Sequence, residues 1–501
     1  MSKLFEQLTP YLEKQMAVNT ALTLFNWDME TLAPADAVEY TSKVIGILSK
    51  EAFLTIVNED VKELVSRLSS KEAQTGLTDK ERAIVANLKK ELAQLEQIPP
   101  KEYQAYSELT AKSQCVWAQA KKHNRYEEFA PLLKEQLAYQ KRFLSYRKKE
   151  DVSSYDLLLN DYEEGFTTKE LDAFFDQLKS AIPPLLKKVT EKNDRISTEF
   201  LTRSYPVDRQ KEFARFLAGY LGFDFNRGVM AESEHPFTTN LHNHDVRITN
   251  HYYENQLDSA IFSVIHEGGH ALYEMGVSDE LTQTLAGTNM SMGIHESQSR
   301  FYENILGRNP AFWKPIYGKL VSFFPEQLSD IPLEHFIQAI NKAQPGLIRT
   351  EADELTYSLH IMVRYELERA LFAEEITVEE LPKLWNEKYQ EYLGITPPDD
   401  TQGILQDVHW SSGSFGYFPS YAIGSAIAAQ IYYHLLDSMP LEQYLREGNL
   451  SVIREYLRDH LHKYGTSRST MELLKNMTGE TFRPDYYIRY LTEKYTKVYQ
   501  L

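Results

Sequence analysis

Residues 261–276, "IFSVIHEGGHALYEMG", hold two histidines separated by one glutamate and two adjacent glycines. Their apolar spacing is that of a helix, in which each glycine costs about 0.5–1 kcal/mol relative to alanine. Residues four apart on a helix lie about 40° apart around its axis, so His266 and His270 project from one face. Glu267 lies about 100° from His266. The spacing predicts two imidazole ligands of one metal ion, flanked by a carboxylate.

A third ligand is expected from the helix that follows. The stretch "MSMGIHESQSRFYENILG" (290–307) places Glu296 26 residues beyond His270, which is enough chain for a loop and a return. Glu296 can complete a set of two histidines and one glutamate that leaves a fourth position to water. Glu267 then stands where a general base belongs. Two interpretations without a metal stay open: solvated histidines on a surface helix, and a Glu296 that only stabilises its own helix start.

The two glycines have different neighbours on a helical wheel. With His266 at 0°, Gly269 falls at about 300°, beside the metal face, and Gly268 at about 200°, within the apolar back of the helix. Gly269 is expected to leave room for the substrate or for the helix that carries Glu296. Gly268 is expected to let another helix approach closely.

Composition limits the class of protein. The 501 residues carry a formal charge of −18, which argues against binding nucleic acid or anionic membranes. Cys115 is the single cysteine, so no disulfide can form within the chain and a reducing, cytoplasmic location is favoured. No stretch approaches the roughly 20 apolar residues of a membrane span.

The rest of the chain is mostly helical in pattern. We expect one domain over residues 1–501, with a helical N-terminal region (about 1–200) packed on a catalytic region (about 201–501). Residues 222–251 are poor in helix formers, and "HDVRITN" alternates as a strand does, so a small antiparallel sheet is expected beside the metal site. Helical spacing is clear in 77–98, 125–147, 168–189, 255–275, 350–375, 420–436 and 483–500.

Several motifs are spread along the chain: HEGGH, "HES" (295–297), "HPF" (235–237), "DVRIT" (245–249), "IRTEADE" (348–354) and "GILQDVHW" (403–410). Together they resemble the thermostable carboxypeptidase Taq family of metallocarboxypeptidases. The segment "NWDMETLAP" (26–34) is also similar to the N-terminal segment of the family, although Ala33 departs from the usual methionine-proline ending.

The resemblance implies a mostly helical, zincin-like fold with a deep cleft and, usually, a homodimer. It implies removal of C-terminal residues from peptides, with zinc or cobalt as the metal. His266, His270 and Glu296 match the metal ligands of the family, and Glu267 matches its general base.

Substrate-binding residues are expected in the remaining motifs. A free carboxylate suits a guanidinium group, and Arg349 is the first choice, although it could instead pair with Asp353 on a helix. Arg247 is the second choice, unless it only braces the sheet with Asp245. His235 could contact substrate or support the metal ligands. Further candidates, as donors to the oxyanion, are His409, Tyr417 and Tyr421, and for Tyr417 packing in an aromatic loop is the favoured interpretation.

Two other functions stay open. A zinc oligopeptidase that cuts internally could use the same helical cleft. A helical binding protein without catalysis could hold basic peptides on an acidic surface, although it would have no need for a base such as Glu267.

Overall fold

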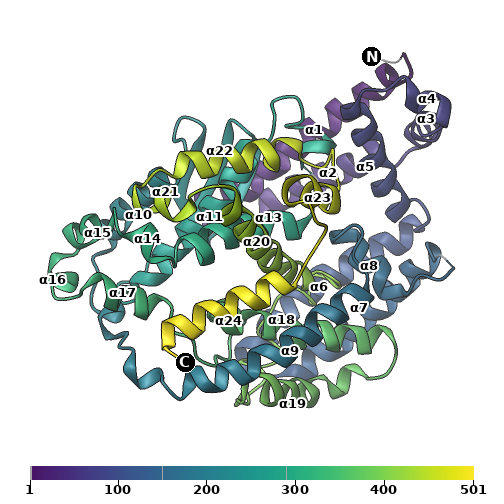
Figure 1. The fold of residues 1–501 in the computed structure, drawn as a ribbon. Helices are drawn as coiled ribbons and strands as arrows, with labels where there is room; N and C mark the ends of the chain where they lie inside the picture. Colours follow the sequence, from purple (N-terminus) through teal and green to yellow (C-terminus); the bar gives the residue numbers. More distant parts are fainter. Residues whose placement is uncertain (1–2, 149, 289) are drawn as a thin grey trace. The chain divides into compact units, whose positions relative to one another are not determined.

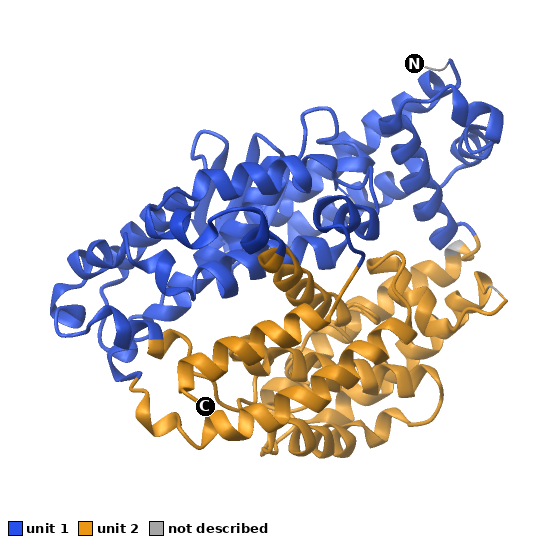
Figure 2. Ribbon diagram, viewed as in Figure 1, with its two compact units in different colours: residues 1–96, 198–337, 434–481 blue, residues 97–197, 338–433, 482–501 orange. Residues whose placement is uncertain are grey.

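The computed structural model describes residues 3–148, 150–288 and 290–501, and most of them are helical (Figure 1). Two compact units are present, each assembled from three segments of the chain (Figure 2). Unit 1 contains residues 1–96, 198–337 and 434–481, and unit 2 contains residues 97–197, 338–433 and 482–501. The mostly helical fold is confirmed. The arrangement as one domain with regions meeting near residue 200 stays a prediction.

Unit 1 holds all the strands of the described residues and sixteen of their α-helices, and α17 ends just inside unit 2. Its helices are α1 (Lys3–Thr31), α2 (Val38–Ile56), α3 (Glu59–Leu68), α4 (Lys71–Thr75), α5 (Asp79–Leu95), α10 (Val207–Leu221), α11 (Leu257–Gly276), α12 (Leu285–Thr288), α13 (Met292–Arg300), α14 (Pro310–Trp313), α15 (Tyr317–Phe323), α16 (Pro325–Leu328), α17 (Leu333–Ile340), α21 (Leu441–Arg446), α22 (Leu450–His460) and α23 (Thr470–Thr478).

The sheet of unit 1 is mixed, with the strand order β1-β3-β2. Its strands are β1 (Gly228–Glu232), β2 (Thr238–His242) and β3 (Asp245–Asn250). A short turn joins β2 to β3, so these two strands are antiparallel as expected. The structure differs from the expected purely antiparallel sheet in one respect, because β1 pairs in parallel with the other edge of β3. β2 is left as an edge strand.

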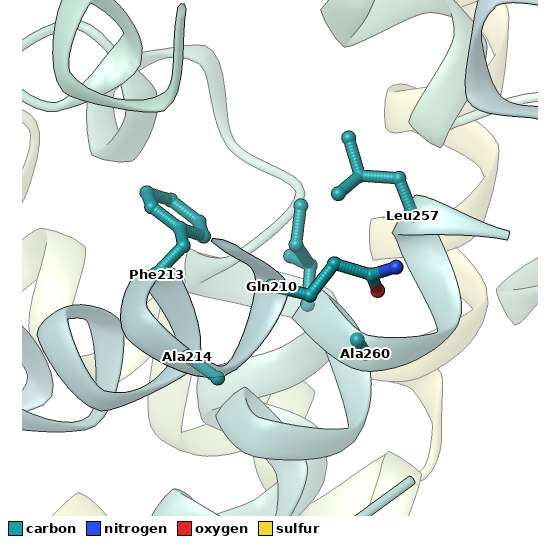
Figure 3. Close-up of a pocket in the computed structure, with 6 residues that line it drawn as sticks. Gln210, Phe213, Ala214, Leu257 and Ala260 are labelled. Atoms are coloured by element: carbon teal, nitrogen blue, oxygen red, sulfur yellow. The ribbon is translucent and has the colours of Figure 1, made fainter. Parts of the chain in front are cut away.

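The HEGGH helix, α11, is a core helix of unit 1. Fifteen of its twenty residues are buried, so packing, not intrinsic propensity, holds its two glycines in a helix. Figure 3 shows a small pocket between α10 and α11, and neither His266 nor His270 lines it. The six residues that line this pocket carry no ionisable group, so it is a packing contact and not a candidate site.

Unit 2 is helical, and α18 is almost entirely buried. None of the described helices of the chain combines the length and the apolar character that crossing a membrane requires. The helices of unit 2 are α6 (Pro100–His123), α7 (Tyr126–Tyr146), α8 (Ser154–Tyr162), α9 (Thr168–Thr190), α18 (Glu354–Phe372), α19 (Leu381–Leu393), α20 (Pro419–Ser438) and α24 (Asp485–Tyr499), of which α20 ends in unit 1.

Candidate metal centre

The structure brings His266, His270 and Glu296 together in unit 1. The Nε2 atoms of His266 and His270 lie 3.8 Å and 3.5 Å from Glu296 Oε2, and one ligand atom from each residue lies within 4.8 Å of the other two. Atoms bound at about 2.0–2.2 Å to one tetrahedral ion are separated by about 3.3–3.6 Å. The three side chains therefore stand close to the spacing that a shared ion requires.

A partly buried carboxylate, that of Glu303, orients His266. The Nδ1 atom of His266 lies 2.7 Å from Glu303 Oε2, and Glu303 lies on the single π-helical turn Phe301–Leu306 that follows α13. Burial works to raise the pKa of Glu303, but Arg300 and the hydrogen bond with His266 outweigh it and lower the pKa to about 2. Because an ionised carboxylate only accepts, the proton sits on Nδ1 and the lone pair of Nε2 faces Glu296.

A second chain of polar groups orients His270. Its Nδ1 lies 2.6 Å from His295 Nδ1, and His295 Nε2 lies 2.7 Å from Glu274 Oε1. Both contacts are satisfied when His270 donates through Nδ1 to His295 and His295 donates through Nε2 to Glu274. Burial and the neighbouring His295 lower the pKa of His270 to about 3, so the ring is neutral near pH 7. Its Nε2 is thus also left as an electron-pair donor.

The charges around the three side chains favour a cation. Arg300 Nε donates to Glu296 Oε1 at 2.6 Å, and Oε2, which faces the histidines, accepts from the Ser299 hydroxyl at 3.2 Å. Four carboxylates with two guanidinium groups leave a formal excess of two negative charges, which a divalent ion would neutralise. The donor set therefore fits a divalent metal. The charged groups are Glu267, Glu274, Glu296 and Glu303 with Arg300 and Arg308.

Glu267 is held by a residue outside its own helix. Thr238 Oγ1, at the start of β2, donates to Glu267 Oε2 at 2.5 Å and lies 3.1 Å from the Glu267 carbonyl oxygen. The Glu267 side chain is otherwise buried, and burial raises its pKa. Its Oε1 accepts no hydrogen bond from the described residues, so this oxygen is the one that can take a proton.

Sequence reasoning assigned no role to Glu303, Glu274 or Thr238. Periodicity offered a signal for two of them, because Glu303 lies two helical turns after Glu296 and Glu274 lies one turn after His270. Thr238 gave no such signal, because it reaches α11 only through the folding of the sheet.

Replacing Glu303 with glutamine is expected to weaken zinc binding about 10- to 100-fold, because the amide no longer fixes the tautomer and orientation of His266. Titration against a competing chelator measures the affinity. Glu254→Gln, a substitution of an exposed glutamate in unit 1, is the matched control. Equal zinc affinity in the two variants would contradict a role for Glu303.

Arg349 lies in unit 2, in a buried cluster of charged groups. Its Nε and one terminal nitrogen each lie 2.9 Å from Asp407 Oδ1, and the other terminal nitrogen donates to the Tyr357 hydroxyl at 3.0 Å. The alternative pairing of Arg349 with Asp353 is not found. Asp353 instead accepts from backbone N–H groups at the start of α18. Arg364 completes the cluster through Asp407 Oδ2.

His409 stands next to this cluster. Its Nε2 is 3.2 Å from the Tyr421 hydroxyl, and its ring centroid is 5.5 Å from that of Tyr417. The buried Nδ1 of His409 makes no hydrogen bond to the described residues. Burial lowers the pKa of His409 to about 4, so this ring is also neutral near pH 7.

The two remaining candidates are in unit 1. Arg247 forms a two-pronged pair with Asp245, with both distances 2.9 Å, and its guanidinium lies 5.6 Å from the centre of the Trp27 ring. This is the bracing contact that the sequence left open. His235 is exposed, and within the described structure its ring contacts none of the three candidate ligands.

Paired histidines one turn apart, with a glutamate from a following helix, form the arrangement of HExxH metallopeptidases. The model of one protein family, described as carboxypeptidase Taq (M32) metallopeptidase, matches residues 7–495. The chain therefore belongs to the carboxypeptidase Taq family, as its motifs suggested, and is a metallocarboxypeptidase.

Relatives in sequence and in structure agree with this membership. Carboxypeptidase 1 of Bacillus subtilis is 42% identical over 482 residues, which cover 96% of each chain. The solved structure of the M32 carboxypeptidase of Deinococcus radiodurans is 32% identical, with a TM-score of 0.95 and 100% of both chains covered. The Pyrococcus furiosus carboxypeptidase structure is 33% identical, with a TM-score of 0.94 and 99% of both chains covered.

Proposed function

We propose that the protein removes single residues from the free C-terminus of peptides, with His266, His270 and Glu296 as metal ligands and Glu267 as general base. The convergence of the two histidine Nε2 atoms on Glu296 Oε2 carries the proposal. A divalent ion held there would acidify water and polarise a carbonyl group. Zinc is the first choice and cobalt the second, since both suit these donors.

Glu267 would perform the proton transfers. Thr238 binds its Oε2, so Oε1 is positioned to take a proton from the water that attacks the scissile carbonyl. The carboxyl group then passes this proton to the departing amine. Burial raises the pKa of Glu267, which makes its carboxylate a stronger base than an exposed one.

We assign recognition of the terminal carboxylate to Arg349. Two buried guanidinium groups, from Arg349 and Arg364, share the single carboxylate of Asp407, so this cluster has a formal positive charge left over. A substrate carboxylate would complete the pairing. His409 Nδ1, which makes no hydrogen bond to the described residues and lies 4.0 Å from Asp407 Oδ1, and Tyr421 would supply further hydrogen bonds.

Arg247 and His235 are retained as second candidates for substrate contact. Arg247 is already paired with Asp245, which makes it the weaker candidate for the carboxylate. A homodimer rests on the family resemblance alone. A cytoplasmic location rests on the single cysteine, which excludes a disulfide within the chain.

A peptide pair tests the proposal directly. One short peptide with a free C-terminus is compared with the same peptide bearing a C-terminal amide, and products are mapped by mass spectrometry. Loss of a charge-assisted hydrogen bond is worth about 1.5–3 kcal/mol, so the amide is expected to be cleaved at least about tenfold more slowly. The expected products are one free amino acid and a peptide shortened by one residue at its C-terminus.

Three other outcomes would contradict the proposal. Equal turnover of both peptides, with internal cuts, would favour an oligopeptidase. Binding without cleavage by metal-loaded protein would favour a peptide-binding protein. Metal analysis that finds no zinc, cobalt or other divalent ion in the purified protein would contradict the assignment of His266, His270 and Glu296 as metal ligands.

A further inference from the structure

The segment that carries His409 has no regular secondary structure, yet it is anchored at two points to one buried side chain. Glu368, in the middle of α18, is completely buried. Its Oε1 accepts from Trp410 Nε1 at 2.6 Å, and its Oε2 accepts from the Gly416 backbone N–H at 2.9 Å. Tyr155, on α8, also donates to Oε2, at 2.7 Å. One carboxylate thus joins α18, α8 and the segment 410–416.

This carboxylate has no ion pair among the described residues. Arg364, one turn earlier on the same helix, uses its N–H groups on Asp407, Gln406 and the His360 carbonyl. Burial raises the pKa of Glu368 to about 7, against the opposing effect of its three hydrogen bonds. A buried carboxylate of this kind stabilises a fold less than an apolar side chain of similar volume would, so packing alone does not account for it.

The backbone at the second anchor point cannot shift freely. Gly416 has φ +82°, and a Cβ there would lie 2.8 Å from Leu158 Cβ and 3.1 Å from the Leu158 carbonyl carbon on α8. The close approach to α8 and the hydrogen bond to Glu368 together define where Gly416 lies.

We propose that Glu368 is a positioning residue, which sets the ring of His409, with the Tyr417 ring packed beside it, for contact of His409 with the C-terminal part of the peptide. His409 immediately precedes Trp410, and Tyr417 immediately follows Gly416, so the two anchor points adjoin the two rings. The inference rests on the proposed function, in which His409 contacts substrate. Glu368 acts only through the segment that it holds.

Glu368→Gln tests the inference with almost no change in volume. A glutamine offers one acceptor oxygen and one NH2 group, so either Trp410 Nε1 or the Gly416 N–H loses its acceptor, and neither can become an acceptor itself. Hydrogen exchange is expected to accelerate at least about tenfold at whichever group loses its acceptor, the Gly416 amide or the Trp410 indole N–H. KM for a peptide with a free C-terminus is expected to rise about tenfold, with kcat changed less than threefold and zinc content unchanged.

Two further variants keep the test decisive. Glu366, on the same helix, pairs with Lys388 and Tyr392 and, among the described residues, makes no hydrogen bond or ion pair with the segment 410–416. Glu366→Gln should therefore leave KM unchanged. Trp410→Phe removes one donor from the same network, so the single variant should raise KM. In the double variant with Glu368→Gln, it should raise KM little further, because both changes act on the same hydrogen-bond network. A wild-type KM in Glu368→Gln would overturn the inference, whatever its melting temperature.

A binding measurement separates this inference from the proposed function. In the Glu267→Gln background, calorimetry gives Kd for the same peptide without a need for turnover. We expect Glu368→Gln to raise this Kd about tenfold. An unchanged Kd would refute the positioning role, whereas a wild-type protein that binds but never cleaves would refute only the proposed hydrolysis.

Discussion

Glu267→Gln lowers peptide turnover by about two to four orders of magnitude, the range that a positioned general base contributes. The amide cannot take the proton of the attacking water, but it keeps the volume of the side chain and can still contact Thr238. The candidate ligands His266, His270 and Glu296 are untouched. Zinc content and peptide affinity are therefore expected to stay within about twofold of wild type, while kcat falls.

Two controls sharpen this prediction. Glu254→Gln makes the same change on an exposed loop of unit 1 and should leave turnover unchanged. Thr238→Val removes the only hydroxyl that binds Glu267 Oε2 among the described residues, so kcat should fall by an intermediate amount, about tenfold. Wild-type kcat in Glu267→Gln would exclude Glu267 as the base and leave the metal ligands as the main source of catalysis.

Local sequence pattern was sufficient for the helices and for the shared face of His266 and His270. The segment 77–98, which has clear helical spacing, contains α5, whose start is closed by reciprocal hydrogen bonds between Thr78 and Glu81. His266 and His270 meet because both stand on one helix, where the spacing of four alone determines the geometry. Such features depend only on near neighbours in the chain.

Partners across the fold were not predictable in this way. Arg349 and Asp353 have the spacing of a helical pair, but the helix begins only after Asp353, whose carboxylate binds free N–H groups of the first turn. Arg349 lies before the helix and finds Asp407, 58 residues along the chain. The same reason explains the parallel pairing of β1 with β3, which no turn between those strands specifies.

Gly269→Ala is expected to lower zinc affinity by at least about 100-fold. A Cβ on Gly269 would lie 2.7 Å from both the Gln298 carbonyl oxygen and Ser299 Cα, which are backbone atoms of α13. Backbone cannot rotate away as a side chain can, so α13 must move, and Glu296 on the same helix moves with it. Overpacking of this kind also costs about 1–3 kcal/mol of stability. Chelator competition and thermal unfolding measure the two effects.

Gly268→Ala is the matched control, one residue earlier on the same helix. Its Cβ would meet only Leu221 Cδ1, at 2.8 Å, and this methyl group is the end of a flexible side chain on α10. Alanine also favours a helix by about 0.5–1 kcal/mol over glycine, which offsets the repacking. Zinc affinity should therefore stay within about threefold of wild type. If both variants lost zinc equally, the approach of α13 to Gly269 could not be what places Glu296, and the two glycines would share a single role in packing.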